Sequence, residues 1–249
     1  MVNHPKIFFS LFPLSAVFWW VFEYLNRFVE NWYYLPILGV DAFTYSFWGS
    51  LSFSIVLPAI YATYEYLMSC HRITLPFKRW WKIRIQNEQL VGWLLLVAAG
   101  LGLVGIGIWP KILFPLLWLS PLLMLLAVQI FQGGDSILRR LRHGDWRLVT
   151  IPALSGLICG FFWELWNSQS LAHWKYAIPY LHAGQVFEMP VLGYAGYLPF
   201  GLECLLCIHL LFPTLEREVA REEDNDPIEE PINLRVGWQT WCDHTKNVS

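Results

Sequence analysis

Six long runs of apolar residues dominate the chain, and short polar or aromatic stretches separate them. A helix that crosses a bilayer needs about 20 such residues. The predicted spans are residues 7–25, 46–68, 90–109, 112–131, 148–167 and 191–212. Pro110-Lys111 ends the third span and can begin the fourth, which predicts a tight helical hairpin. We therefore expect an all-α fold, a polytopic bundle of six transmembrane helices over residues 1–212.

Composition agrees with the pattern. Hydrophobic residues make up 56% of the 249 positions and charged residues only 14%, against about 25% in soluble domains. The pair Cys204 and Cys207 has no second ligand pair at metal-site spacing. We expect an integral membrane protein without a metal, a cofactor or a nucleic-acid partner.

The basic residues predict an orientation. All but three of the 17 Lys and Arg fall in the N-terminus, the second and fourth loops or the tail, the exceptions being Arg27, Lys111 and Lys175. Under the positive-inside rule this places both termini in the cytoplasm, as in a multi-pass protein of the inner (cytoplasmic) membrane. Residues 213–249 hold nine acidic residues and read as an acidic cytoplasmic tail. Residues 76–84 mix bases with tryptophans, which fits a stretch on anionic headgroups or an ordinary loop.

The two ends of the bundle sequence resemble each other. Glu23-x-x-Asn26 matches Glu164-x-x-Asn167, and further matches follow at offsets of 141 to 143 residues. The matched segments are 31–36 with 173–179 and 57–58 with 198–199. Because the first and fifth spans have the same direction, we expect a parallel duplication about an axis along the membrane normal, with repeat units of about 7–68 and 148–212. Chance similarity between aromatic-rich spans is the alternative.

Carboxylates inside apolar runs are costly and indicate a role. Glu23 and Glu164 each share a helix face with an asparagine, Asn26 and Asn167. If the copies face each other, these groups converge on an acid site or a polar ligand site. The alternative is that each Glu braces the aromatic loop of its own repeat.

Glu203 lies at mid-bilayer in the sixth predicted span, where it should face the bundle and stay protonated. A neutral carboxylic acid can donate a proton, so Glu203 is the first candidate for catalysis. Glu188 enters the same span from the outer side and is a candidate ligand-binding residue. We expect Glu164 and Glu203 to line one internal pocket.

Glycine motifs in the spans indicate packing. Gly100-x-Gly102-x-x-Gly105 fits a dinucleotide-binding pattern, but it lies inside an apolar span with no strand before it. Together with Gly156-x-x-x-Gly160, it predicts close approach of helices.

The order Trp163-Glu164, Trp174-x-Tyr176 and residues 196–199 before Glu203 resembles the repeat of integral-membrane lycopene cyclases and carotenoid hydratases. That resemblance covers about 45 residues and implies duplicated three-span units. The sequence departs from it where the cyclases carry Pro-x-Glu-Glu at a helix start, because only Pro199 and Glu203 stand there. The pattern also resembles uncharacterised bacterial inner-membrane proteins, which imply no activity.

Two functions follow as hypotheses. The first is an intramembrane enzyme acting on an isoprenoid or lipid by carboxylic-acid proton transfer. Its catalytic residues would be Glu203, Glu164 and Glu23, and Trp163, Trp174 and Tyr176 would bind the substrate and stabilise a cation. The second is a non-catalytic protein that binds a lipid or pigment or scaffolds a membrane complex. A transporter ranks third, and association with a second copy or a membrane partner stays open.

Overall fold

The apolar runs form helices. The computed structural model describes residues 4–35, 41–133, 136–181 and 184–215. Its α-helices are α1 (Pro5–Val29), α2 (Ala42–Phe53), α3 (Val56–Ser69), α4 (His71–Thr74), α5 (Glu88–Ile108), α6 (Pro110–Leu113), α7 (Leu116–Gln132), α8 (Ile137–His143), α9 (Arg147–Ser168) and α10 (Tyr197–Leu211). Two 3-10 helices are η1 (Leu75–Phe77) and η2 (Val191–Gly196). The strands are β1 (Trp32–Tyr34), β2 (Trp174–Tyr176), β3 (Gln185–Val186) and β4 (Met189–Pro190).

Polar side chains mark several helix starts. The carboxylate of Asp41 accepts a hydrogen bond from the N–H of Thr44 at the start of α2, and Asn87 and Ser136 cap α5 and α8 in the same way. Such caps satisfy N–H groups that have no partner in the first turn. The sequence therefore encodes these helix boundaries locally.

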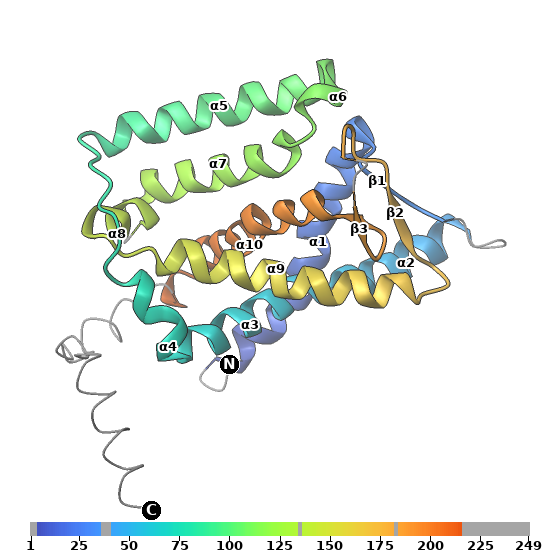
Figure 1. The fold of residues 1–249 in the computed structure, drawn as a ribbon, viewed down its shortest axis with the longest axis horizontal. Coiled ribbons are helices and arrows are strands. Elements are labelled where there is room, and N and C mark those ends of the chain that lie inside the picture. The colour runs from blue at the N-terminus through green and yellow to red at the C-terminus, as the bar shows by residue number, and fades with distance from the viewer. Residues whose placement is uncertain (1–3, 36–40, 134–135, 182–183, 216–249) are drawn as a thin grey trace, which may run out of the picture. The chain divides into compact units, whose positions relative to one another are not determined.

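Several helical segments are long and apolar enough to cross a membrane. Five satisfy this within the described residues: Pro5–Val29, Ala42–Ser69, Glu88–Ile108, Arg147–Ser168 and Val191–Leu211. Helices α7 and α8 satisfy it together and are bent by 82° against each other, so the number becomes six if they count as one span. The helical, membrane-type fold expected from the sequence is confirmed, and the expected hairpin is formed by α5 and α7 (Figure 1).

Helix α10 lies at the centre of the bundle. It packs against α9, α7 and α3, while α1 packs on α2 and α3. Phe200, near its start, is fully buried. The Phe200 ring contacts five other aromatic rings, those of Phe18, Trp19, Phe22, Trp118 and Trp163. This aromatic cluster joins α1, α7 and α9 to α10.

Small residues allow the close helix contacts. A Cβ at Gly156 would collide with the carbonyl oxygen of Tyr197, and one at Gly201 with the carbonyl of Pro152. A Cβ at Gly102 would collide with the hydroxyl of Ser120 across the α5–α7 contact. The prediction that the glycine motifs serve packing is therefore confirmed at these positions; Gly100 faces open space.

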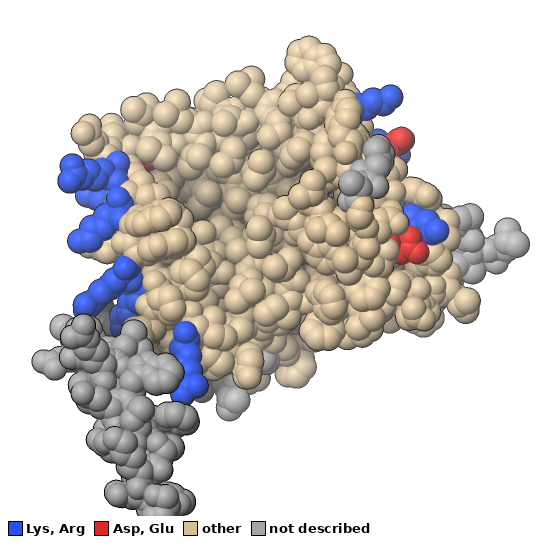
Figure 2. Space-filling model, in the orientation of Figure 1, with Lys and Arg blue, Asp and Glu red and all other residues tan. Residues whose placement is uncertain are grey.

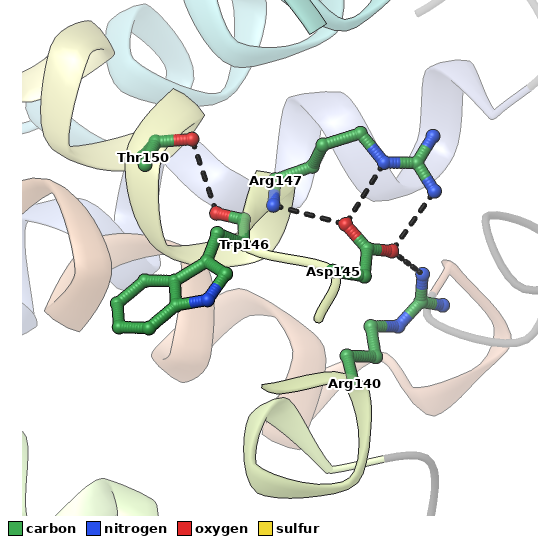
Figure 3. Close-up of polar contacts among 5 residues, drawn as sticks. All are labelled: Arg140, Asp145, Trp146, Arg147 and Thr150. Carbon is green, nitrogen blue, oxygen red and sulfur yellow. Dashed lines mark hydrogen bonds and ion pairs between the residues drawn. The ribbon is translucent and has the colours of Figure 1, made fainter. Parts of the chain in front are cut away.

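One end of the bundle, formed by α4, η1 and α8, is basic, and we call it the basic end. Lys and Arg side chains gather there, and the surface between the two ends is almost uncharged (Figure 2). Asp145, between α8 and α9, accepts hydrogen bonds from N, Nε and Nη2 of Arg147 at 3.0, 2.9 and 2.9 Å and forms an ion pair with Arg140 at 3.5 Å (Figure 3). These contacts fix the start of α9. The opposite end carries β1 and β2, and we call it the ribbon end. The bundle is one compact unit that ends at Pro213.

Candidate functional site

Glu23 lies in the last two turns of α1, next to the antiparallel pair of strands β1 and β2, which we call the ribbon. Its Oε1 accepts hydrogen bonds from Nε1 of Trp19 at 3.0 Å, from Nε1 of Trp32 at 3.0 Å and from the hydroxyl of Tyr34 at 2.6 Å. Three donors around one carboxylate oxygen form a cage, and each donor is an aromatic side chain. We call this group the Glu23 cage.

Glu164 occupies the corresponding place on α9 and is 0% exposed. Its Oε1 accepts hydrogen bonds from the hydroxyls of Tyr176 at 2.6 Å and Tyr197 at 2.8 Å. It also accepts a longer one, at 3.4 Å, from Nε1 of Trp174, whose N–H donates to the Tyr176 hydroxyl at 2.8 Å as well. We call this group the Glu164 cage. Its Oε2 has no hydrogen-bond partner among the described residues.

Asn26 and Asn167 brace the strands that supply the cages. The Nδ2 of Asn26 donates to the carbonyl of Trp32 at 2.8 Å, and its Oδ1 accepts from the N–H of Asn31 at 2.8 Å. Asn167 makes both bonds to Trp174, donating to its carbonyl at 2.9 Å and accepting from its N–H at 2.8 Å. The Glu-x-x-Asn spacing thus puts the carboxylate and the brace on one helix face, one turn apart.

The ribbon joins the two cages. Strands β1 and β2 pair antiparallel, with Trp32 opposite Tyr176, Tyr33 opposite Lys175 and Tyr34 opposite Trp174. Side chains directly opposite each other lie on the same face of such a pair. Each cage therefore draws two donors from its own strand, and the strands hold the two cages side by side.

The third donor differs between the cages. Trp19 lies one turn before Glu23 on α1, whereas Gly160 lies one turn before Glu164 on α9. The ring of Tyr197 lies against Gly160, where any Cβ would collide with it. Tyr197 from α10 thus provides to Glu164 the bond that Trp19 provides to Glu23.

A pocket of about 1090 Å³ lies beside the cages, bounded by α1, α2, α7, α9, η2 and both ribbon strands. Twelve of its lining residues are aromatic: Trp19, Trp32, Tyr34, Tyr45, Trp48, Phe53, Trp118, Trp163, Trp166, Trp174, Tyr176 and Tyr197. Its polar lining includes Asn31, Asn167 and Asp41. The cage donors therefore present one side to the pocket and donate their polar hydrogens to the carboxylates.

Two of these tyrosines are held in the protonated form. Burial, followed by the negative charge of Glu23, raises the pKa of Tyr34 well above its ordinary value. Burial, followed by the neighbouring Tyr197 and Glu164, raises the pKa of Tyr176. Both hydroxyls thus remain hydrogen-bond donors to their carboxylates across the physiological pH range.

The structure brings together some of the candidates from the sequence. Asn167, Trp163, Trp174 and Tyr176 line the pocket. Glu23 and Glu164 lie behind its aromatic wall, where their donors separate them from it. Asn26 is buried in its brace.

Glu203 and Glu188 lie elsewhere. Glu203 is 0% exposed and is not among the lining residues, and neither of its carboxyl oxygens has a hydrogen-bond partner among the described residues. Glu188 pairs with Lys175 at 3.8 Å and does not line the pocket. Neither Glu164 nor Glu203 lines this pocket, so it is not the shared pocket expected from the sequence.

Sequence reasoning missed the first cage's donors and much of the pocket wall. In the internal sequence match, Trp32 aligns with Trp174 and Tyr34 aligns with Tyr176, so the repeat could have identified them. Trp118 and the α2 wall leave no sequence signal, because only the packing of α7 and α2 brings them to the site.

Comparisons with known proteins leave the chain without an assigned family. No protein-family model matches it, and no curated protein and no solved structure gives a significant match.

Proposed function

We propose that this chain is an integral membrane protein that binds an isoprenoid or another lipid in the aromatic pocket. The observation that carries the proposal is the volume of about 1090 Å³ with a largely aromatic wall. Ligand sites are concave, mainly apolar and of this size, with a few polar groups that orient the ligand.

The proposal includes six spans with both termini in the cytoplasm, so the basic end faces the cytoplasm and the pocket opens in the outer half of the bilayer. It also includes a parallel duplication. Support comes from the two equivalent cages and from the register of the ribbon. A two-fold rotation about the centre of the pair Tyr33–Lys175 would place Trp32 on Trp174 and Tyr34 on Tyr176. A two-fold axis along the membrane normal would produce this exchange.

Photolabelling tests the binding proposal. A farnesol analogue with a diazirine should label peptides of the pocket wall, and excess farnesol should prevent it. Ser52, an exposed residue of α2 that lines the pocket, gives the variant Ser52→Trp, which should reduce labelling several-fold by filling space. Ser46→Trp, on the same helix but outside the lining, is the matched control. Labelling that is equal in both variants would contradict the proposal.

A second candidate is acid–base catalysis on the bound lipid. Tyr34, Tyr176 and Tyr197 line the pocket, and the hydroxyl of each donates a hydrogen bond to a glutamate of a cage. When the cage glutamate is protonated, the tyrosine can deliver its proton to a double bond and take the glutamate's proton in its place, which leaves a carboxylate and a substrate cation stabilised by aromatic faces. Loss of a proton from a neighbouring carbon of the cation, passed back through the tyrosine, restores the carboxylic acid. Because Glu203 is not part of the pocket, we assign this role to the cages.

Solvent exchange distinguishes catalysis from binding. An unsaturated ligand incubated with the protein in heavy water should gain deuterium at carbon if the cages transfer protons. The Tyr34→Phe/Tyr176→Phe/Tyr197→Phe triple variant should abolish the gain, and Tyr33→Phe, on the same ribbon without a cage contact, should retain it. Binding without any deuterium gain would leave the non-catalytic function.

A further inference from the structure

The charge in the described wall of the pocket is negative. None of its described lining residues is Lys, Arg or His, and Asp41 is a carboxylate. The hydrogen bonds from the side chain and backbone of Thr44 hold the pKa of Asp41 below its ordinary value. Asp41 is therefore ionised at neutral pH. It is a solvent-exposed member of the lining, and no lysine, arginine or histidine stands beside it in the described wall.

Two carboxyl groups lie directly behind the pocket's wall. Glu23 and Glu164 each accept three hydrogen bonds from rings of the wall, so both carboxyl groups lie directly behind aromatic side chains. Hydrogen bonding to an acceptor polarises the donor ring and increases the electron density on its face. Lys175 of β2 stands in the sequence between the lining residues Trp174 and Tyr176. It pairs with Glu188 and is not itself a lining residue.

Aromatic faces attract cations, and the attraction is greatest for cations that lose little hydration. Estimates run from about 0.5–1 kcal/mol at exposed sites to about 2 kcal/mol in desolvated ones. Quaternary ammonium groups are such cations, and aromatic cages are their usual binding sites. An anionic end group would meet Asp41 and the negative faces of the rings.

We propose that the polar end of the pocket's ligand is a quaternary ammonium or a similar organic cation, attached to an apolar chain. This inference rests on the proposed function, because it specifies the ligand of the same pocket. The arrangement would also stabilise a cationic state formed during proton transfer to a double bond.

Three chain-matched probes test the inference: decyltrimethylammonium, decanol and decanoate, at submicellar concentration. The protein is held in an uncharged maltoside detergent, because phosphatidylcholine headgroups are themselves quaternary ammonium groups, and binding is followed by tryptophan fluorescence. Seven of the 15 tryptophans line the pocket, so a bound probe should change the emission. We expect the ammonium probe to bind roughly 3- to 30-fold more tightly than the alcohol, which corresponds to the range for cation–π contacts, and decanoate to bind most weakly.

Two isosteric variants locate the effect. Asp41→Asn retains a residue that caps α2 well and removes the charge, so it should reduce the preference for the ammonium probe several-fold. Glu30→Gln removes an exposed carboxylate at the end of α1, outside the lining, and should leave the preference unchanged.

The outcomes separate the two proposals. Saturable decanol binding with no ammonium preference, or a preference that Asp41→Asn leaves intact, overturns the cationic ligand and leaves the lipid pocket. Absence of saturable binding by all three probes overturns both.

Discussion

Trp32 and Tyr176 are cross-strand partners in the β1–β2 ribbon, yet they donate their side-chain hydrogen bonds to different carboxylates. Trp32 binds Glu23 on α1, and Tyr176 binds Glu164 on α9. The ribbon therefore connects the two cages, and a substitution in one strand should alter the hydrogen bonds of both cages.

Loss of one cage donor should weaken the fold. Tyr176→Phe removes the 2.6 Å bond to Glu164 and leaves a buried carboxylate short of a donor. Hydrogen bonds to charged groups contribute about 1.5–3 kcal/mol, so we expect a free energy of unfolding lower by about that amount. Tyr33→Phe, whose exposed side chain is not part of a cage, should change it by less than about 0.5 kcal/mol. Thermal unfolding in detergent measures the difference, and equal Tm values would contradict the cage.

A disulfide should form across the ribbon. Tyr33 and Lys175 are directly opposite in the antiparallel pair, at a Cα separation of about 4.5–5.5 Å that suits a disulfide. Tyr33→Cys with Lys175→Cys should oxidise readily, as shown by mass spectrometry of the linked peptide. Tyr33→Cys with Ala177→Cys, two residues out of register, should not. Efficient linkage of the second pair alone would mean another register.

The space at Gly160 should be essential. A Cβ there would collide with the Tyr197 ring, which is held in place by its bond to Glu164. We expect Gly160→Ala to destabilise the protein by about 1–3 kcal/mol, as for overpacking in a core. Gly100→Ala faces open space and should be neutral, or stabilising by up to about 1 kcal/mol. Unfolding titrations of the two variants decide, and similar stabilities would remove the role assigned to Gly160.

Burial of Glu203 should have a cost. Its carboxyl group is 0% exposed, and neither oxygen has a hydrogen-bond partner among the described residues. Replacing a buried, unsatisfied polar group by an apolar one of similar size removes a desolvation penalty of about 1–3 kcal/mol. Glu203→Leu should therefore raise the Tm, while Glu203→Gln should not. A lower Tm in Glu203→Leu would show that the carboxyl group is satisfied in the membrane.

The tyrosines should make stability depend on alkaline pH. The pKa values of Tyr34 and Tyr176 are higher in the folded protein than in an unfolded chain, where they are about 10. Above that pH the unfolded state loses protons that the folded state keeps, so the stability is complete below about pH 10 and decreases as the pH rises. The Tyr34→Phe/Tyr176→Phe double variant should show a shallower decrease between pH 9 and 11. An unchanged slope would contradict the shifts.

Much of the fold and part of the site could be predicted from the sequence. The apolar runs identify the helices because burial and membrane insertion require them, and the residue pairs Glu23–Asn26 and Glu164–Asn167 identify the cage helices because carboxylates in apolar runs are expensive. The ribbon could not be read in the same way, since a pairing between β1 and β2 depends on contacts across about 140 residues of chain.

Glu203 illustrates the limit. Its depth in the span follows from the helical rise, but the direction of its side chain depends on how α10 rotates against α7 and α9. Gly156 and Gly201 let α9 and α10 approach closely, and Glu203 of α10 is not among the residues that line the pocket. Periodicity alone does not contain this information.

The most direct test of the central claim, a lipid site in the aromatic pocket, is the mass of what the pocket holds. The protein is purified in mild detergent from its native membrane, and bound molecules are identified by native mass spectrometry followed by lipid extraction. We predict one dominant isoprenoid or lipid species at a ratio near one per chain in the wild type and in Ser46→Trp, and its loss in Ser52→Trp. The same mixture of bulk membrane lipids on all three proteins would contradict the claim.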